Sequence, residues 1–92
     1  MASPDPAKEP DATGRKVAEQ HVEAFFRKGR AAYLRESFVL PERTWTALAE
    51  KATGKAISHL RGECWYLARE SIMERLVSER TAWLARRKEH HS

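Results

Sequence analysis

The sequence has few of the residue patterns that build catalytic, metal and disulfide sites. Cys64 is the only cysteine, so no intrachain disulfide can form. The glycines are scattered and make no loop that could cradle a phosphate. His59 and Cys64 lie near each other in the sequence, but no CxxC, HExxH or histidine pair at i, i+4 accompanies them. We therefore expect no catalytic residue, no metal, no cofactor and no enzymatic activity.

Long apolar runs are also missing. A bilayer-spanning helix needs about 20 consecutive apolar residues, and the chain has no such run. The first eleven residues lack the basic start and apolar centre of a signal peptide. We expect a cytoplasmic protein that makes no membrane contact. At 92 residues the chain suffices for one small domain, and a core of that size is often shared with a second copy.

The charge is unevenly distributed, although the net value is only +4. Residues 13–35 hold six Lys or Arg against two acids, and residues 75–92 hold five against two. Residues 36–74 are nearly neutral, with five bases and six acids. Basic flanks of this kind favour contact with phosphates, or they are simply solvated surface.

The N-terminal segment is rich in proline and acids. Because proline removes backbone donors and acids favour solvation, we expect residues 1–12 to be a disordered tail and residues 13–92 to form one helical domain. Thr13 is a candidate N-cap for the first helix. Apolar residues then recur at helical spacing up to Phe26. This helix either ends at Gly29 or continues through it.

The centre of the sequence combines a short alternating stretch with an amphipathic segment. Residues 35–40 alternate weakly, which predicts a strand. Pro41 cannot lie inside a central strand but suits the first turn of a helix. The helix that follows carries an apolar stripe at i, i+3, i+4 and i+7, which consists of Trp45, Leu48, Ala49 and Ala52. Gly54 is expected to end it.

The last predicted helix begins at Ser58, a good N-cap residue. Its apolar residues cover a wide arc that shifts between the first half and the second. A helix with so broad an apolar arc usually packs on more than one partner, and a second subunit is the simplest source of one. The fold class predicted is mainly α with one short strand, with an all-α bundle as the alternative.

Residues 35–73 resemble the ribbon–helix–helix family of DNA-binding proteins, the group of the phage Arc repressor and plasmid copy-number repressors. The matching features are an alternating segment that ends in Leu40-Pro41-Glu42, a helix that carries Leu48 and Ala52, and Ser58 as the next cap. The resemblance implies a dimer whose paired strands enter the major groove. By position, the strand residues that would face the bases are Arg35, Ser37 and Val39.

The resemblance implies a small homodimeric protein that binds double-stranded DNA as a transcriptional repressor or as a plasmid or phage accessory factor. The start of the last helix, at Ser58 and His59, would hold a phosphate through backbone amides. Exposed bases would add salt-dependent affinity for the backbone, and the candidates are Arg27, Lys28 and Arg30.

A second hypothesis needs no strand and no nucleic acid. An all-helical chain of this size would suit a protein-interaction module such as an adaptor, an antitoxin or an inhibitor. A groove lined by exposed Trp and Leu would then bind a second protein. The two hypotheses differ most directly in the conformation expected for residues 34–41.

Overall fold

A computed structural model describes residues 8–91 of the chain. In this part the chain is mainly α-helical, as predicted, and it contains no strand. The elements are α1 (Lys8–Arg27), α2 (Gly29–Glu36), the 3-10 turn η1 (Ser37–Val39), α3 (Glu42–Ala56) and α4 (Gly62–His91).

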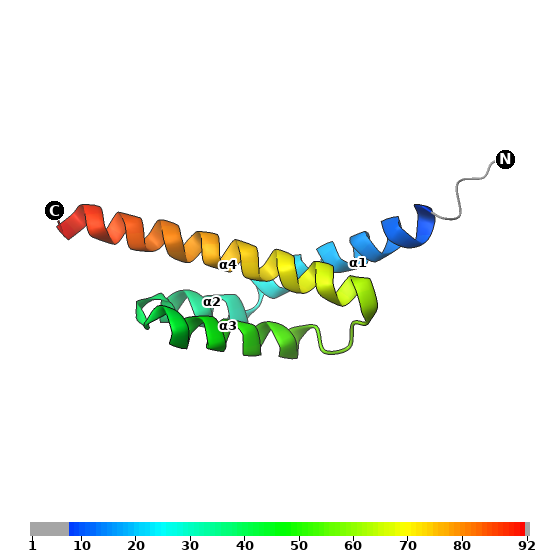
Figure 1. Cartoon of the computed structure of the whole chain (residues 1–92), viewed down its shortest axis with the longest axis horizontal. Helices are drawn as coiled ribbons and strands as arrows, with labels where there is room; N and C mark the ends of the chain where they lie inside the picture. Colours follow the sequence, from blue (N-terminus) through cyan, green and yellow to red (C-terminus); the bar gives the residue numbers. More distant parts are fainter. Residues whose placement is uncertain (1–7, 92) are drawn as a thin grey trace.

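The long helix α4 organises the other helices (Figure 1). α2 and α3 form an antiparallel hairpin along one side of α4, and α1 packs against the part of α4 nearer its N-terminus. The C-terminal end of α4 runs past the connection between α2 and α3. A helix of 30 residues is about 45 Å long, which is more than the shorter helices can cover.

The hydrophobic core draws on every helix. Phe25 comes from α1, Leu34 from α2, and Trp45 from α3, and each is at least 97% buried. The inner part of α4 contributes a stripe at helical spacing that consists of Ala68, Ile72 and Leu76. The predicted stripe on α3 is confirmed, because Trp45 and Ala49 are buried and its other two members are partly buried against them.

Trp45 fixes the hairpin to the core. Its indole nitrogen donates a hydrogen bond of 3.1 Å to the carbonyl oxygen of Leu34, near the end of α2. The ring also meets Phe38 edge-on, with the centroids 5.6 Å apart. A buried indole requires a partner for its N–H, and this contact supplies one while joining α3 to α2.

The strand predicted for residues 35–40 is wrong. Arg35 and Glu36 complete α2, and Ser37–Val39 form η1. Only Leu40 and Pro41 are extended, with ψ angles of 155° and 149°. Proline disfavours a helical conformation in the residue before it, which accounts for the extended backbone of Leu40. Pro41 does precede a helix, as predicted, since α3 starts at Glu42.

The boundaries of the last two helices also differ from those predicted. α3 does not end at Gly54 but continues to Ala56. Ser58 does not cap α4; it lies in the turn after α3, where its hydroxyl donates to the carbonyl oxygen of Lys55 at 3.2 Å. α4 starts instead at Gly62, whose φ of 59° is a conformation that favours glycine.

α1 begins before the predicted N-cap at Thr13, because its first residue is Lys8. Residues 1–7 of the predicted disordered tail lie outside the described residues. The question left open at Gly29 is resolved in favour of two helices. Lys28 has an extended backbone, with φ −95° and ψ 169°, and separates α1 from α2.

Candidate functional site

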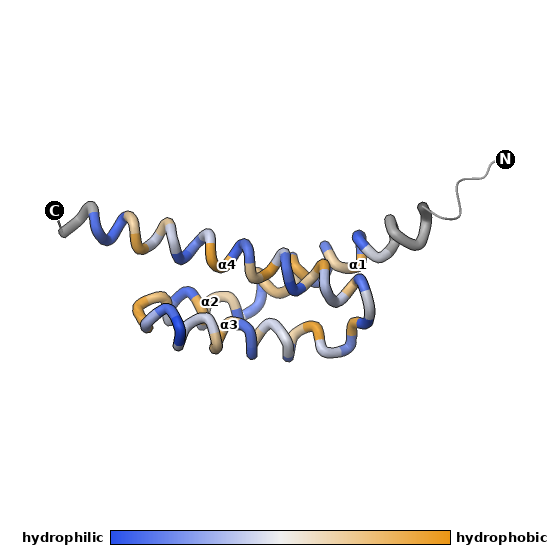
Figure 2. The backbone as a smooth tube through the Cα atoms, viewed as in Figure 1, coloured by the Kyte–Doolittle hydropathy of each residue, from blue (hydrophilic) through white to orange (hydrophobic). Residues whose placement is uncertain are grey.

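The part of α4 that follows Leu76 carries two large apolar side chains that are exposed to solvent, Val77 and Leu84. Leu76 is fully buried, whereas residues 77–88 are all exposed or only partly buried. We call residues 62–76 the inner half of α4 and residues 77–88 the outer half. Figure 2 shows hydrophobic and hydrophilic residues interspersed along the outer half.

Arg80 ties the outer half to the corner between η1 and α3. Its Nε donates to the carbonyl oxygen of Phe38 at 3.3 Å, and its Nη2 donates to that of Leu40 at 2.9 Å. The guanidinium carbon also lies 5.4 Å from the centre of the Trp45 ring. Carbonyls at the end of a helical segment lack partners within it, and a cation is a favourable donor to them.

A second polar contact joins the outer half to α2. Arg35 donates two hydrogen bonds to the Glu79 carboxylate, at 2.8 and 3.0 Å, and Arg75 lies 3.6 Å from the same group. The Arg35 hydrogen bond is the main cause that holds the pKa of Glu79 below its ordinary value, and burial opposes it. Arg75 in turn covers the ring of Phe26 on α1, 4.1 Å from its centre.

Beyond these contacts, an apolar stripe stays open to solvent. Val77 and Leu84 are 44% and 38% exposed, and their spacing of seven residues places them on one face of α4. A groove of about 200 Å³ lies beside them, between α3 and α4. Its lining residues are Glu42, Trp45, Thr46, Val77, Arg80, Thr81 and Leu84.

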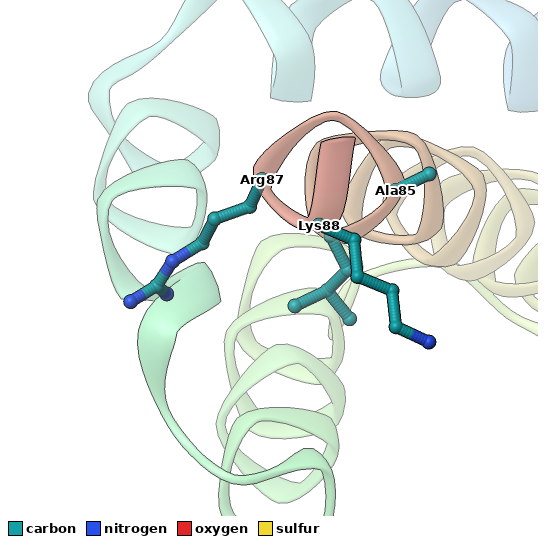
Figure 3. A pocket seen from close by; sticks show the side chains of 4 residues that line it. Ala85, Arg87 and Lys88 are labelled. Atoms are coloured by element: carbon teal, nitrogen blue, oxygen red, sulfur yellow. The ribbon is translucent and has the colours of Figure 1, made fainter. Parts of the chain in front are cut away.

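A larger hollow, of about 600 Å³, lies at the far end of the outer half, where it is lined by Leu84, Ala85, Arg87 and Lys88. Figure 3 shows Arg87 and Lys88 extending to different sides of α4. The Arg87 guanidinium carbon lies 5.0 Å from the centre of the Trp83 ring. The ring centroid of Trp83 is in turn 5.9 Å from that of Phe38. Trp83 therefore marks the place where α4 leaves the hairpin.

The strand residues that were predicted to face DNA bases do not share an edge in this fold. Arg35 is held by Glu79. The Ser37 hydroxyl donates to the carbonyl oxygen of Tyr33 at 2.9 Å, and Val39 is 60% exposed in η1. The structure thus distributes these three side chains over the end of α2 and η1, without the alternation that a ribbon would give.

The other predicted DNA contacts fall into two places. Ser58 and His59 belong to the turn after α3, and His59 contacts His21 of α1. Arg27, Lys28 and Arg30 lie together at the junction of α1 and α2, and all three are exposed.

Sequence reasoning missed Arg80, although the sequence contains a signal for it. Arg80 lies four residues after Leu76 and three before Trp83, so the helical period places it on the face that packs inward. A cation at such a position requires acceptors, because a charge without partners is costly to bury. The signal indicates that acceptors exist, but it does not identify the carbonyls of Phe38 and Leu40.

No protein-family model, curated protein or solved structure matches this chain. The fold and the geometry of α4 are therefore the basis for inferring its function.

Within residues 8–91, no helix combines the length and the apolar character that crossing a bilayer requires.

Proposed function

We propose that the chain is a helical protein-interaction module that binds an amphipathic helix of a partner protein on the outer half of α4. The observation that carries this proposal is the open stripe formed by Val77 and Leu84 beside the groove between α3 and α4. On the same helix, Ala68, Ile72 and Leu76 of the inner half are fully buried, whereas the outer half has no fully buried side chain.

The dimensions of the stripe suit helix-in-groove recognition. Val77 and Leu84 are two helical turns apart, about 10 Å, which matches apolar residues at i and i+7 on an opposing helix. Trp45 lines the groove, but at 1% exposure it fixes the shape of the groove and offers a partner little surface of its own. Because two exposed side chains and one groove make a small interface, we expect reversible binding rather than a permanent complex.

The charge of the outer half favours one kind of partner. Arg86 and Arg87 are exposed beyond the stripe, and the one acid among residues 77–88 is Glu79, which is already paired with Arg35. An opposing helix with acidic residues beside its apolar stripe would gain electrostatic complementarity and a faster approach. Basic residues at the same positions of the opposing helix would repel Arg86 and Arg87 and slow the association.

A matched pair of baits tests this proposal. The set of proteins captured by the parent chain should differ in one or a few members from the set captured by the Val77→Glu, Leu84→Glu double variant. Tyr33→Glu on α2 is the control, because Tyr33 is 53% exposed and lies outside the stripe. A protein retained by the parent and the control but lost by the double variant supports the proposal, and its affinity should fall at least about tenfold. Identical retention by all three baits contradicts it.

The sequence leads us to expect a homodimer, and we propose that a second copy of the chain could bind the same stripe. If a second copy is the partner, sedimentation should show the parent as a dimer and the double variant as a monomer. The Tyr33→Glu control should then stay dimeric. A dimer that persists in the double variant would place the contact between copies elsewhere.

A second candidate function is binding of double-stranded DNA, as in a transcriptional regulator. The exposed group formed by Arg27, Lys28 and Arg30 favours it, because clustered bases contact phosphates. Base contact by Arg35 would require its ion pair with Glu79 to break. The cytoplasmic location expected from the sequence would suit this function and the first one equally.

Fluorescence anisotropy with mixed duplex DNA at low salt tests the second function. Replacing Arg27, Lys28 and Arg30 with Gln should reduce the slope of log affinity against log salt by up to about 0.9 per lost phosphate contact. Lys51→Gln, at an exposed position of α3, is the control. Absence of binding to the parent chain, or an unchanged slope in the triple variant, would exclude this basic group as a DNA contact.

A further inference from the structure

Two histidines far apart in the sequence face each other at the surface. His21 of α1 and His59 of the turn after α3 place their Nε2 atoms 2.8 Å apart. Their ring centroids are 4.8 Å apart, and the ring planes are inclined by 49°. We propose that this pair is a two-histidine site for a divalent transition metal of the zinc, nickel and copper class.

The orientation of His21 is the first argument. Its Nδ1 lies 2.8 Å from the carbonyl oxygen of Val17, one turn earlier on α1. The carbonyl can only accept, so Nδ1 carries the proton, and the lone pair of the neutral ring is on Nε2, directed at His59. Metal-binding histidines almost always have this outer hydrogen bond, which fixes the tautomer and the ring orientation.

The second argument is that the ligand spacing can be reached by a small movement. Two nitrogens on a tetrahedral zinc, each about 2.0–2.1 Å from the metal, are about 3.3 Å apart. The present distance of 2.8 Å is that of a hydrogen bond, in which His59 donates to His21. His59 lies in a turn rather than a helix, so its ring can move outward by the required half ångström and turn until both lone pairs point at one ion. When the metal binds, the proton on Nε2 of His59 moves to Nδ1 of the same ring. Both Nε2 atoms then offer a lone pair to the metal, and both rings stay neutral.

The site offers two protein ligands and leaves the other positions for water. No three His, Cys, Asp or Glu side chains gather as a metal site in the described part of the chain. Cys64 does not join the pair, because its thiol is 3.5 Å from the carbonyl oxygen of Gly14, two turns before His21 on α1. Imidazole nitrogen selects zinc, copper and nickel over magnesium and calcium, which prefer oxygen.

A metal at this position would join α1 to the connection between α3 and α4. Both histidines are accessible, since His59 is exposed and His21 is partly buried, so an ion can enter without unfolding. Binding to the folded chain alone raises its stability as the metal concentration rises above the dissociation constant. This inference is independent of the partner that the outer half of α4 binds.

Calorimetric titration of the full chain with ZnCl2 tests the proposal. His90→Ala and His91→Ala are introduced first, because these neighbouring histidines could bind metal by themselves. In this background we expect one zinc per chain and a melting temperature that rises with zinc. Adding His59→Ala should weaken the affinity at least about tenfold and abolish the thermal shift, and His21→Ala should do the same.

Cys64→Ser in the same background is the control, and it should bind zinc as the parent does. His59→Ala alters an exposed turn residue, so its circular dichroism should match the parent. Three results would overturn the proposal. These are no zinc binding at millimolar concentration, unchanged affinity in His59→Ala, or one zinc for every two chains. MgCl2 should shift the melting temperature in none of the variants.

Discussion

The two halves of α4 are parts of one continuous helix, but they are held in different ways. The inner half packs Ala68, Ile72 and Leu76 into the core, and each has no exposed surface. The outer half buries no side chain fully and is attached to the hairpin through Arg80 and Glu79. The inner half therefore contributes mainly to stability, whereas the outer half keeps apolar surface available for binding.

The strongest test of this difference compares two leucines on α4. Leu76→Ala leaves a cavity in the core and should lower the free energy of unfolding by about 2–5 kcal/mol. Leu84→Ala removes a side chain that is already 38% exposed and should lower it by about 0.5 kcal/mol or less. Urea denaturation of both variants provides the measurement. Similar losses would show that the outer half is buried in solution, by a partner copy or by a different packing.

The next test concerns the hydrogen bonds from Arg80 to the carbonyl oxygens of Phe38 and Leu40. Arg80→Met keeps an apolar chain over Trp45 but leaves the carbonyls of Phe38 and Leu40 without their charged donor. We expect a loss of about 1.5–3 kcal/mol in the free energy of unfolding. Arg43→Met, at an exposed position of α3, is the matched control and should change it little. Equal effects of the two substitutions would mean that the hydrogen bonds of Arg80 do not stabilise the fold.

The smallest effect is expected at Glu79. Because both side chains of its ion pair with Arg35 are partly exposed, 41% and 28%, Glu79→Gln should cost about 1 kcal/mol or less at pH 7. Arg35 holds the pKa of Glu79 below the ordinary 4.5, so the contribution is complete above that pH. It is lost as the pH falls through the lowered value.

Denaturation of the parent chain and Glu79→Gln from pH 7 to pH 3 provides the measurement. The two stabilities should converge toward acid as the carboxylate of the parent becomes protonated. A difference that stays constant across this range would show that the carboxylate charge is not what stabilises the pair.

The helices were predictable from the sequence because their periodicity is local. Trp45 and Ala49 on α3, and Ile72 and Leu76 on α4, repeat at the spacing that a helix requires, and the structure buries them together. The proline ahead of α3 was equally informative. Boundaries were harder to predict, because Ser58 is chemically suited to cap a helix but lies in a turn instead.

The conformation of residues 35–40 could not be predicted, because its determinants lie about 40 residues further along the chain. Arg35 binds Glu79, and Arg80 binds the carbonyls of Phe38 and Leu40. A weak alternation over six residues carries no information about those distant partners, so by itself it predicts a strand. The approach of His21 to His59 has the same origin, since it depends on how α1 packs against the hairpin.

The three tryptophans occupy different environments, which gives the chain its own optical reporters. Trp45 is 1% exposed and should fluoresce at short wavelength until the whole domain unfolds. Trp83 is only partly buried, between Phe38 and the guanidinium of Arg87. Its emission should change when another molecule displaces that guanidinium, while the signal from Trp45 stays constant. A Trp65→Phe variant would leave these two emitters, so that docking and denaturation could be followed separately in one unlabelled sample.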